Sequence, residues 1–154
     1  MRDFVQGLPQ SAKEALLRAG WRPDRRVDVD QWHETLSAEG FVLFDLAADV
    51  LATFGGLEVH PAIMHGEFEN APILFEPELA GSGSLDIALE LRTMFDQDFY
   101  PIAEWITSSC VSLGSAGIVV DYHDVELLSV ADSFEEGLRV MLLADRTLPL
   151  LRAY

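Results

Sequence analysis

Cysteine is almost absent from this 154-residue sequence, because Cys110 is its only instance. A single cysteine cannot form an internal disulfide, and Cys110 lies in an apolar stretch with no adjacent base that would activate a thiolate. The sequence also lacks an apolar run close to the roughly 20 residues that cross a bilayer, and its first residues do not have the basic-then-apolar order of a secretory signal. These absences predict a cytoplasmic protein with no membrane partner, in which Cys110 is a small core residue.

Basic side chains are also few, and they are unevenly distributed. Ten Lys and Arg residues stand against 26 Asp and Glu residues, which gives a formal net charge of -16. Residues 1–26 hold six basic and three acidic side chains, a local charge of +3, so residues 27–154 carry -19. A field of that sign repels nucleic acid and anionic membranes and attracts basic partners, although acidity can also serve solubility alone.

The composition is otherwise that of a folded globular protein. Hydrophobic residues make up 49% of the chain and charged residues 23%, values that are too apolar for a disordered chain. A chain of this length can bury one sizeable core, and the sequence contains no repeat or linker. We therefore expect residues 1–154 to form a single domain.

Capping signals and helical spacing of apolar residues predict several helices. Ser11 with Glu14 and Ser133 with Glu136 have the spacing of a capping box, while Gly20, Gly40 and the pair Gly55 and Gly56 are stop signals. The predicted helices cover residues 11–20, 28–40, 46–54, 84–95 and a final segment from 133. In the fourth, Leu85, Ala88, Leu89, Arg92 and Phe95 stand at helical spacing.

Short extended segments alternate with turn residues in the remaining sequence. The predicted strands are 57–60, 73–75, 101–106, 110–113, 118–122 and 125–130, and 41–44 is a further extended candidate. Short connections between consecutive strands force antiparallel pairing, and the apolar tail 147–154 is expected to dock on the body. The sequence thus predicts an α+β fold, an antiparallel sheet with helices packed on one face.

A family resemblance rests on several segments spread over nearly the whole chain. They are the run 20–28 (GWRPDRRVD), Trp32, Gly40 with Phe41, the run 51–57 (LATFGGL), Tyr100 to Ile102, and the run 131–138 (ADSFEEGL). This order resembles the SUKH superfamily, specifically its third immunity subgroup. The resemblance implies an immunity protein, which is not an enzyme and needs no cofactor, and which binds and neutralises a cognate toxin encoded beside it. Many such toxins act on nucleic acids, so the expected partner is a basic nuclease or nucleic-acid deaminase domain.

Structural roles are predicted for a group of residues within the resembling segments. Arg25 matches an arginine of the family pattern and is expected to form an ion pair at the helix that Asp28 and Asp30 open. Aromatic residues beside stop-signal glycines are expected in the core rather than in an aromatic binding patch. The predicted structural residues are Trp21, Arg25, Trp32, Phe54, Gly55 and Gly56.

Partner-binding residues are predicted where carboxylates lie beside large apolar side chains, because an aromatic anchor with a charged rim is typical of protein interfaces. The same carboxylates also fit a solvated face. Two groups are predicted: Glu67, Phe68, Glu69, Phe75, Glu76 and Glu78 in the middle of the chain, and Asp121, Asp124 and Glu126 at the last hairpin.

Two other classes of function remain as alternatives. His60, His65 and Glu67 could ligate zinc in a small metal-dependent hydrolase, although their spacing matches no known motif and Pro61 and Gly66 favour a loop. The turn 81–84 could cradle an anion but lacks the lysine of a phosphate loop. A regulatory protein-interaction scaffold is the other alternative, since other members of the superfamily resemble adaptors.

Overall fold

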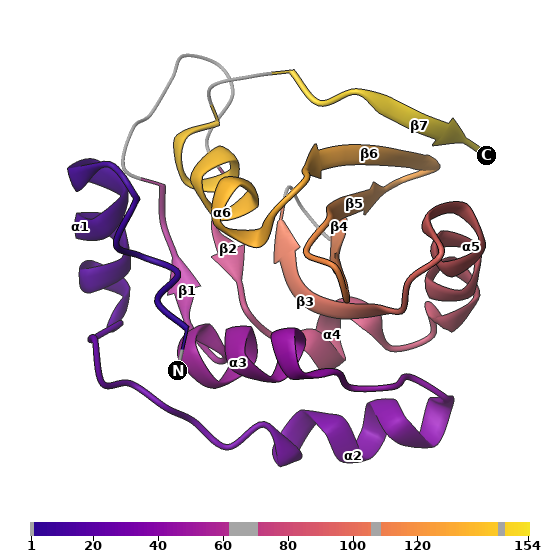
Figure 1. The fold of residues 1–154 in the computed structure, drawn as a ribbon, viewed down its shortest axis with the longest axis horizontal. Coiled ribbons are helices and arrows are strands. Elements are labelled where there is room, and N and C mark those ends of the chain that lie inside the picture. Colours follow the sequence, from indigo (N-terminus) through magenta and orange to yellow (C-terminus); the bar gives the residue numbers. More distant parts are fainter. Residues whose placement is uncertain (1, 62–70, 106–108, 145–146) are drawn as a thin grey trace.

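The computed structural model describes residues 2–61, 71–105, 109–144 and 147–154. Within these ranges the chain forms six helices and a seven-stranded sheet (Figure 1). The helices are α1 (Gln10–Ala19), α2 (Asp30–Glu39), α3 (Asp45–Phe54), α4 (Pro77–Gly81), α5 (Leu85–Phe95) and α6 (Phe134–Leu143). The strands are β1 (Glu58–Val59), β2 (Ile73–Leu74), β3 (Phe99–Trp105), β4 (Ser109–Gly114), β5 (Val119–His123), β6 (Glu126–Ala131) and β7 (Leu150–Ala153).

The two predicted capping boxes have different outcomes. At α6 the Ser133 hydroxyl accepts a hydrogen bond from the Glu136 amide at 3.2 Å, so this cap is confirmed. At α1 the prediction was wrong, because the helix begins at Gln10 with Pro9 as its N-cap and no side chain caps it. Proline has no amide to satisfy and its fixed φ suits entry into a helix, so Ser11 lies inside the first turn.

The predicted stop signals at Gly20 and Gly40 are confirmed. Both glycines have left-handed backbone conformations, with φ of 109° and 115°, and their amides bond back to carbonyls of the helices they end. Side chains rarely adopt this conformation, which explains why glycine ends α1 and α2. Helix α3 also ends as predicted, at Phe54 directly before Gly55.

The sheet is an antiparallel meander in which each strand pairs with its neighbour in the sequence, in the order β1 to β7. The predicted strands are present with small shifts at their ends. The extended candidate 41–44 is not a strand, and the tail predicted to dock does so as β7, which pairs antiparallel with β6. Short helix α4 was not predicted, since its five residues carry too little periodicity to be recognised.

The α+β class is confirmed, but helices cover both faces of the central strands rather than one. A Cβ added at Gly81 of α4 would lie 2.3 Å from Pro101, and one added at Gly137 of α6 would lie 2.8 Å from Val119. Through the strand register, Pro101 shares a face with Val120, and Val119 points to the opposite face. Strands β3 and β4 are accordingly buried almost throughout.

An aromatic cluster joins the two ends of the chain in the core. The rings of Phe54 and Phe75 stack at 5.4 Å, and Phe4 meets Phe134 edge-on at 5.1 Å. Phe54 also contacts Phe4 and Phe134. The cluster therefore ties the N-terminal segment, α3, the end of β2 and α6 together.

No helix in the described ranges combines the length and the apolarity needed to cross a membrane.

Candidate functional site

The middle group of predicted partner-binding residues is divided by the structure. Glu67, Phe68 and Glu69 lie outside the described residues. Phe75 is fully buried, so it is not available as a surface anchor and that assignment is corrected. Phe75 directly follows β2, and residues along an extended segment alternate between the core and the surface. The sequence alone did not reveal whether Phe75 or Glu76 faces inward.

Glu76 and Glu78 lie around the start of α4, and both are half-buried. Glu76 has a structural partner, because its carboxylate accepts a hydrogen bond from the Trp32 indole Nε1 at 3.0 Å. Trp32 is itself buried, with only 6% of its surface exposed. A buried indole nitrogen normally needs an acceptor, so Glu76 supports the core. Glu78 is the described member of the middle group that stays a candidate contact.

The hairpin group is divided as well. Asp124 and Glu126 are exposed at the turn between β5 and β6, where Asp124 adopts a left-handed conformation with φ of 53°. Asp121 is fully buried, so it cannot be a surface contact in this structure. The sequence places these acidic residues within six positions of each other, but Asp121 lies inside β5 whereas Asp124 lies in the turn and Glu126 begins β6.

Asp121 is an unusual buried group. Neither of its carboxylate oxygens makes a hydrogen bond of normal geometry within the described residues. Burial raises the pKa of Asp121 to about 7, and the nearby Ser109 hydroxyl, which favours the charged form, offsets only part of this effect. Asp121 therefore holds a proton in the folded protein at pH values where an ordinary aspartate has lost it.

The exposed tip of the hairpin is held against β7 and α5. The amide of Tyr154 donates to the carbonyl of Val125 at 2.7 Å, and the Tyr154 ring meets that of Tyr122 edge-on at 5.9 Å. The Tyr154 hydroxyl and the Arg152 guanidinium both bond the carboxylate of Glu90 on α5. One carboxylate thus fastens the final strand to a helix more than 60 positions earlier in the sequence.

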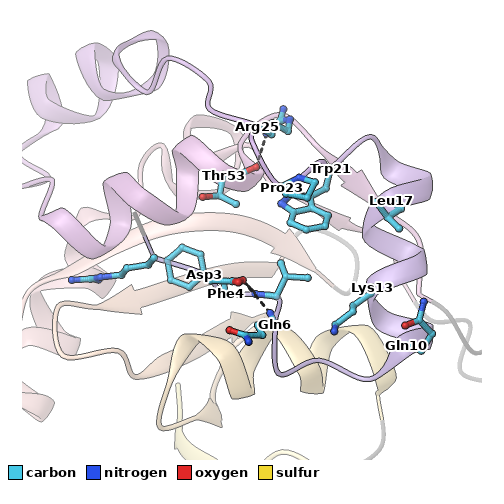
Figure 2. A pocket seen from close by; sticks show the side chains of 12 residues that line it. Asp3, Phe4, Gln6, Gln10, Lys13, Leu17, Trp21, Pro23, Arg25 and Thr53 are labelled. Atoms are coloured by element: carbon cyan, nitrogen blue, oxygen red, sulfur yellow. Dashed lines mark hydrogen bonds between the residues drawn. The ribbon is translucent and has the colours of Figure 1, made fainter.

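A cleft of about 570 Å³ lies between the N-terminal segment, α1 and the loop that follows it (Figure 2). Basic side chains line it, namely Arg2, Lys13 and Arg25, with Trp21 beside them. The acidic Asp3 also lines the cleft, but its carboxylate accepts the amides of Val5 and Gln6, each at 3.0 Å. The cleft could receive an anionic group, although its lining contains no serine, cysteine or histidine that could act as a nucleophile or base.

Arg25 has the predicted structural role through different partners. Its guanidinium donates to the backbone carbonyls of Thr53 and Gly55, each at 2.8 Å. No ion pair joins it to Asp28 or Asp30 within the described residues, so that expected contact is corrected. Carbonyls at a helix C-terminus carry partial negative charge and lack partners in the helix, which makes them good acceptors for arginine.

The predicted aromatic and glycine residues of the structural group mostly pack as expected. Phe54 is fully buried and Trp32 nearly so, while Trp21 is half-buried at the rim of the cleft. Gly55 lies against the Trp32 ring, where an added Cβ would come within 2.5 Å of ring atoms. Gly56 adopts a left-handed conformation with φ of 84°.

The alternative chemical sites find little support from the described side chains. His60 is exposed and lies 3.6 Å from Glu58, whereas His65 and Glu67 fall outside the described residues. In the described ranges no three His, Cys, Asp or Glu side chains are grouped to hold a metal ion. Cys110 is buried, and burial raises the pKa of its thiol to about 12, so it is the inert core residue that was expected.

The glycine-rich turn before α5 binds a carboxylate from the protein itself. The Ser82 hydroxyl and the Gly83 amide donate to Glu39 of α2 at 2.8 and 3.0 Å. This contact fixes the end of α2 to the start of α5. The turn therefore acts as a structural connection.

The family model that matches this chain is described as SUKH-3 immunity protein, and it covers residues 8–143. The comparisons with curated proteins and with solved structures give no match.

Proposed function

Because the chain belongs to the SUKH-3 immunity protein family, we propose that it binds a cognate toxin domain and neutralises it inside the cell that makes both. The single observation that carries this proposal is the family match over residues 8–143. In this proposal residues 1–154 act as one cytoplasmic domain, by binding alone, without a cofactor or a reaction of their own.

The toxin in this proposal is a basic nuclease or nucleic-acid deaminase. An enzyme that acts on nucleic acid presents a basic groove to the phosphate backbone. A chain with a net charge of -16 is attracted to such a groove over long distances and competes there with nucleic acid. The acidity supports this choice of toxin, and it gives no reason to expect direct binding of nucleic acid by the immunity protein.

Coexpression tests the function directly. The toxin domain encoded beside this gene is produced in a host cell with and without the full chain. We expect the toxin alone to stop growth, and we expect growth to return, with recovery of a stable complex, when both are present. Continued arrest despite normal production of the immunity protein would contradict the proposal.

Metal analysis of the purified chain separates binding from the hydrolase alternative. Stoichiometric zinc that disappears in a His60→Ala/His65→Ala variant would support a metal site and oppose the binding-only function. We expect no such loss, and we expect the double variant to protect cells as the wild type does.

The candidate contacts that stay in the proposal are Glu67, Phe68, Glu69 and Glu78 in the middle of the chain and Asp124 and Glu126 at the hairpin. Phe75 and Asp121 are left out because both are fully buried, and Glu76 because it bonds to Trp32.

A further inference from the structure

Exposed apolar side chains gather on one side of the molecule. Among the described residues seven large apolar side chains are substantially exposed, and four of them belong to this side: Val42 at 61%, Leu89 at 51%, Val125 at 53% and Tyr154 at 52%. In Figure 1 the end of α2, helix α5, the tip of the β5–β6 hairpin and the C-terminus all lie toward the right. Clusters of this kind mark binding surfaces, whereas single exposed apolar residues need no explanation.

Two of these residues share a hollow beside α5. Val42 and Leu89 line one shallow hollow together with Leu85. Leu89 stands at helical spacing with Leu85 and Ala88, but the residues of α5 that are buried are Ala88 and Leu91. Leu89 is 51% exposed, so a large part of its side chain is free to enter a pocket of a partner.

The other two residues lie on the opposite flank of α5. Tyr154 bonds Glu90 of that helix and pairs through its amide with Val125. Asp86 lies one helical turn before Glu90 on the same helix, so the two carboxylates share one side of α5. Helix α5 thus connects the two apolar pairs into one surface.

Acidic side chains surround these apolar residues. Asp86 and Glu126 are exposed and have no cationic partner within the described residues. The basic side chains nearby are already paired, because Arg92 lies 3.4 Å from Asp98 and Arg152 bonds Glu90. The surface therefore presents an excess of negative charge around an apolar centre.

We propose that this surface, formed by Val42, Asp86, Leu89, Val125, Glu126 and Tyr154 and called the α5 face below, is where the basic toxin domain binds. The inference rests on the proposed function. Leu89 and Val42 would supply apolar anchors that lose water in the complex, and the carboxylates would attract and orient the basic partner. A second copy of this chain fits less well, since a twofold contact would place two copies of this acidic surface against each other.

The anchors are tested by dissociation kinetics with the purified toxin domain that the neighbouring gene encodes. The variant Val42→Ala/Leu89→Ala removes two exposed side chains without opening a cavity, and Leu17→Ala on α1, a leucine that is 39% exposed, is the matched control. We expect the double variant to dissociate at least about tenfold faster and the control to change less than about twofold.

The acidic rim is tested by association kinetics at low salt. Asp86→Lys/Glu126→Lys reverses two charges on the α5 face, and Glu14→Lys/Asp24→Lys makes the same change in net charge at exposed positions near α1. We expect association to slow by at least about fivefold more in the first pair than in the second. Equal slowing in both pairs would overturn the assignment of the rim, because only the total charge would then matter.

The outcomes separate this inference from the proposed function. Tight toxin binding that both α5-face variants leave unchanged, or that Glu67→Lys/Glu69→Lys weakens more than they do, would overturn the α5 face and leave the immunity function standing. A wild-type chain that never binds the toxin domain would overturn both. Analytical ultracentrifugation of the free protein tests whether a second copy of this chain covers the α5 face. A dimer that Val42→Ala/Leu89→Ala converts to a monomer would show that it does, and would overturn the assignment of this surface to the toxin.

Discussion

Trp32 connects three parts of the core through one side chain. Its ring lies against Gly55, its indole nitrogen bonds Glu76, and it belongs to the buried face of α2 together with Leu36. Removing the ring would leave a cavity between α2 and the loop after α3 and an unpaired carboxylate at its edge. Both effects lower the free energy of unfolding.

We expect Trp32→Ala to lower the free energy of unfolding by about 3 to 5 kcal/mol. Denaturant unfolding followed by circular dichroism measures the change. Trp21→Ala is the matched control, because Trp21 is only half-buried at the cleft and should lose clearly less. A Trp32→Ala protein with unchanged stability would show that this ring does not support the core.

Asp121 should make stability depend on pH in the direction opposite to that of a salt-bridged carboxylate. Its pKa is raised from 3.8 to about 7 by burial. Between these values the folded state keeps a proton that the unfolded state has lost, so the free energy of unfolding falls as pH rises. Below pH 4 both states are protonated, and above about pH 7 the full cost of the buried charge is present.

We expect Asp121→Asn to remove this pH dependence, since asparagine keeps the shape and carries no charge. The variant should be more stable than the wild type at pH 8, by up to a few kcal/mol, and the difference should vanish toward pH 4. Denaturant unfolding at several pH values gives the difference curve. A constant difference across this range would contradict a raised pKa at Asp121.

At the scale of elements, α1 and α6 carry the same capping sequence and use it differently. The Ser133 hydroxyl caps α6, while Ser11 lies one residue inside α1. A capping box is a local pattern, but the start of a helix also depends on the preceding residue and on the packing of the chain that leads into it. Pro9 moves the start of α1 upstream by its fixed φ.

This difference predicts responses of different size to the same substitution. Ser133→Ala should lower the free energy of unfolding by about 1 kcal/mol through loss of the cap. Ser11→Ala should change it by less than about 0.5 kcal/mol, because alanine is the better helix former inside a turn. Equal losses in the two variants, measured by denaturant unfolding, would contradict the assigned start of α1.

Helix α5 shows that helical spacing alone does not identify the buried face of a helix. Leu85, Leu89 and Phe95 share helical spacing, yet Leu89 is exposed and Leu91 is fully buried. In a helix rich in apolar residues, several stripes fit the spacing equally well, and only the position of β3 and β4 beneath the helix decides which one is covered. The exposure of Leu89, on which its proposed contact with the toxin rests, is seen only in the folded chain.

For the whole molecule, the net charge of -16 should govern how fast a partner arrives. The summed field acts at distances where no single pair contributes much, since exposed pairs give only about 0 to 1 kcal/mol each. The Debye length shortens from about 30 Å at 0.01 M salt to about 8 Å at 0.15 M. Salt therefore screens the long-range attraction before it affects contacts in the complex.

We expect the association rate constant with the cognate toxin domain to fall at least about tenfold between 0.01 M and 0.15 M salt. The dissociation rate constant should change by less than about threefold over the same range, because apolar contacts at the interface are not screened. Stopped-flow measurements determine both constants. An association rate that is independent of salt would exclude steering by the charge of this chain.

The sequence by itself determined those features that arise from neighbouring residues. The glycine stops after α1 and α2, the Ser133 cap, the strands joined by short turns and the acidic excess all follow from local backbone geometry or from addition of charges. The family resemblance, carried by runs such as 20–28 and 131–138, likewise agrees with the match over residues 8–143.

Only the tertiary structure decided which side of each element is covered. Phe75 and Asp121 are inside while Asp124 and Leu89 are outside, and the sequence patterns of these residues do not distinguish the two cases. Burial depends on what the rest of the chain places against an element. Contacts such as Glu90 with Tyr154 and Arg25 with Gly55 join positions far apart in the sequence, so they form only when the sheet and its helices have assembled.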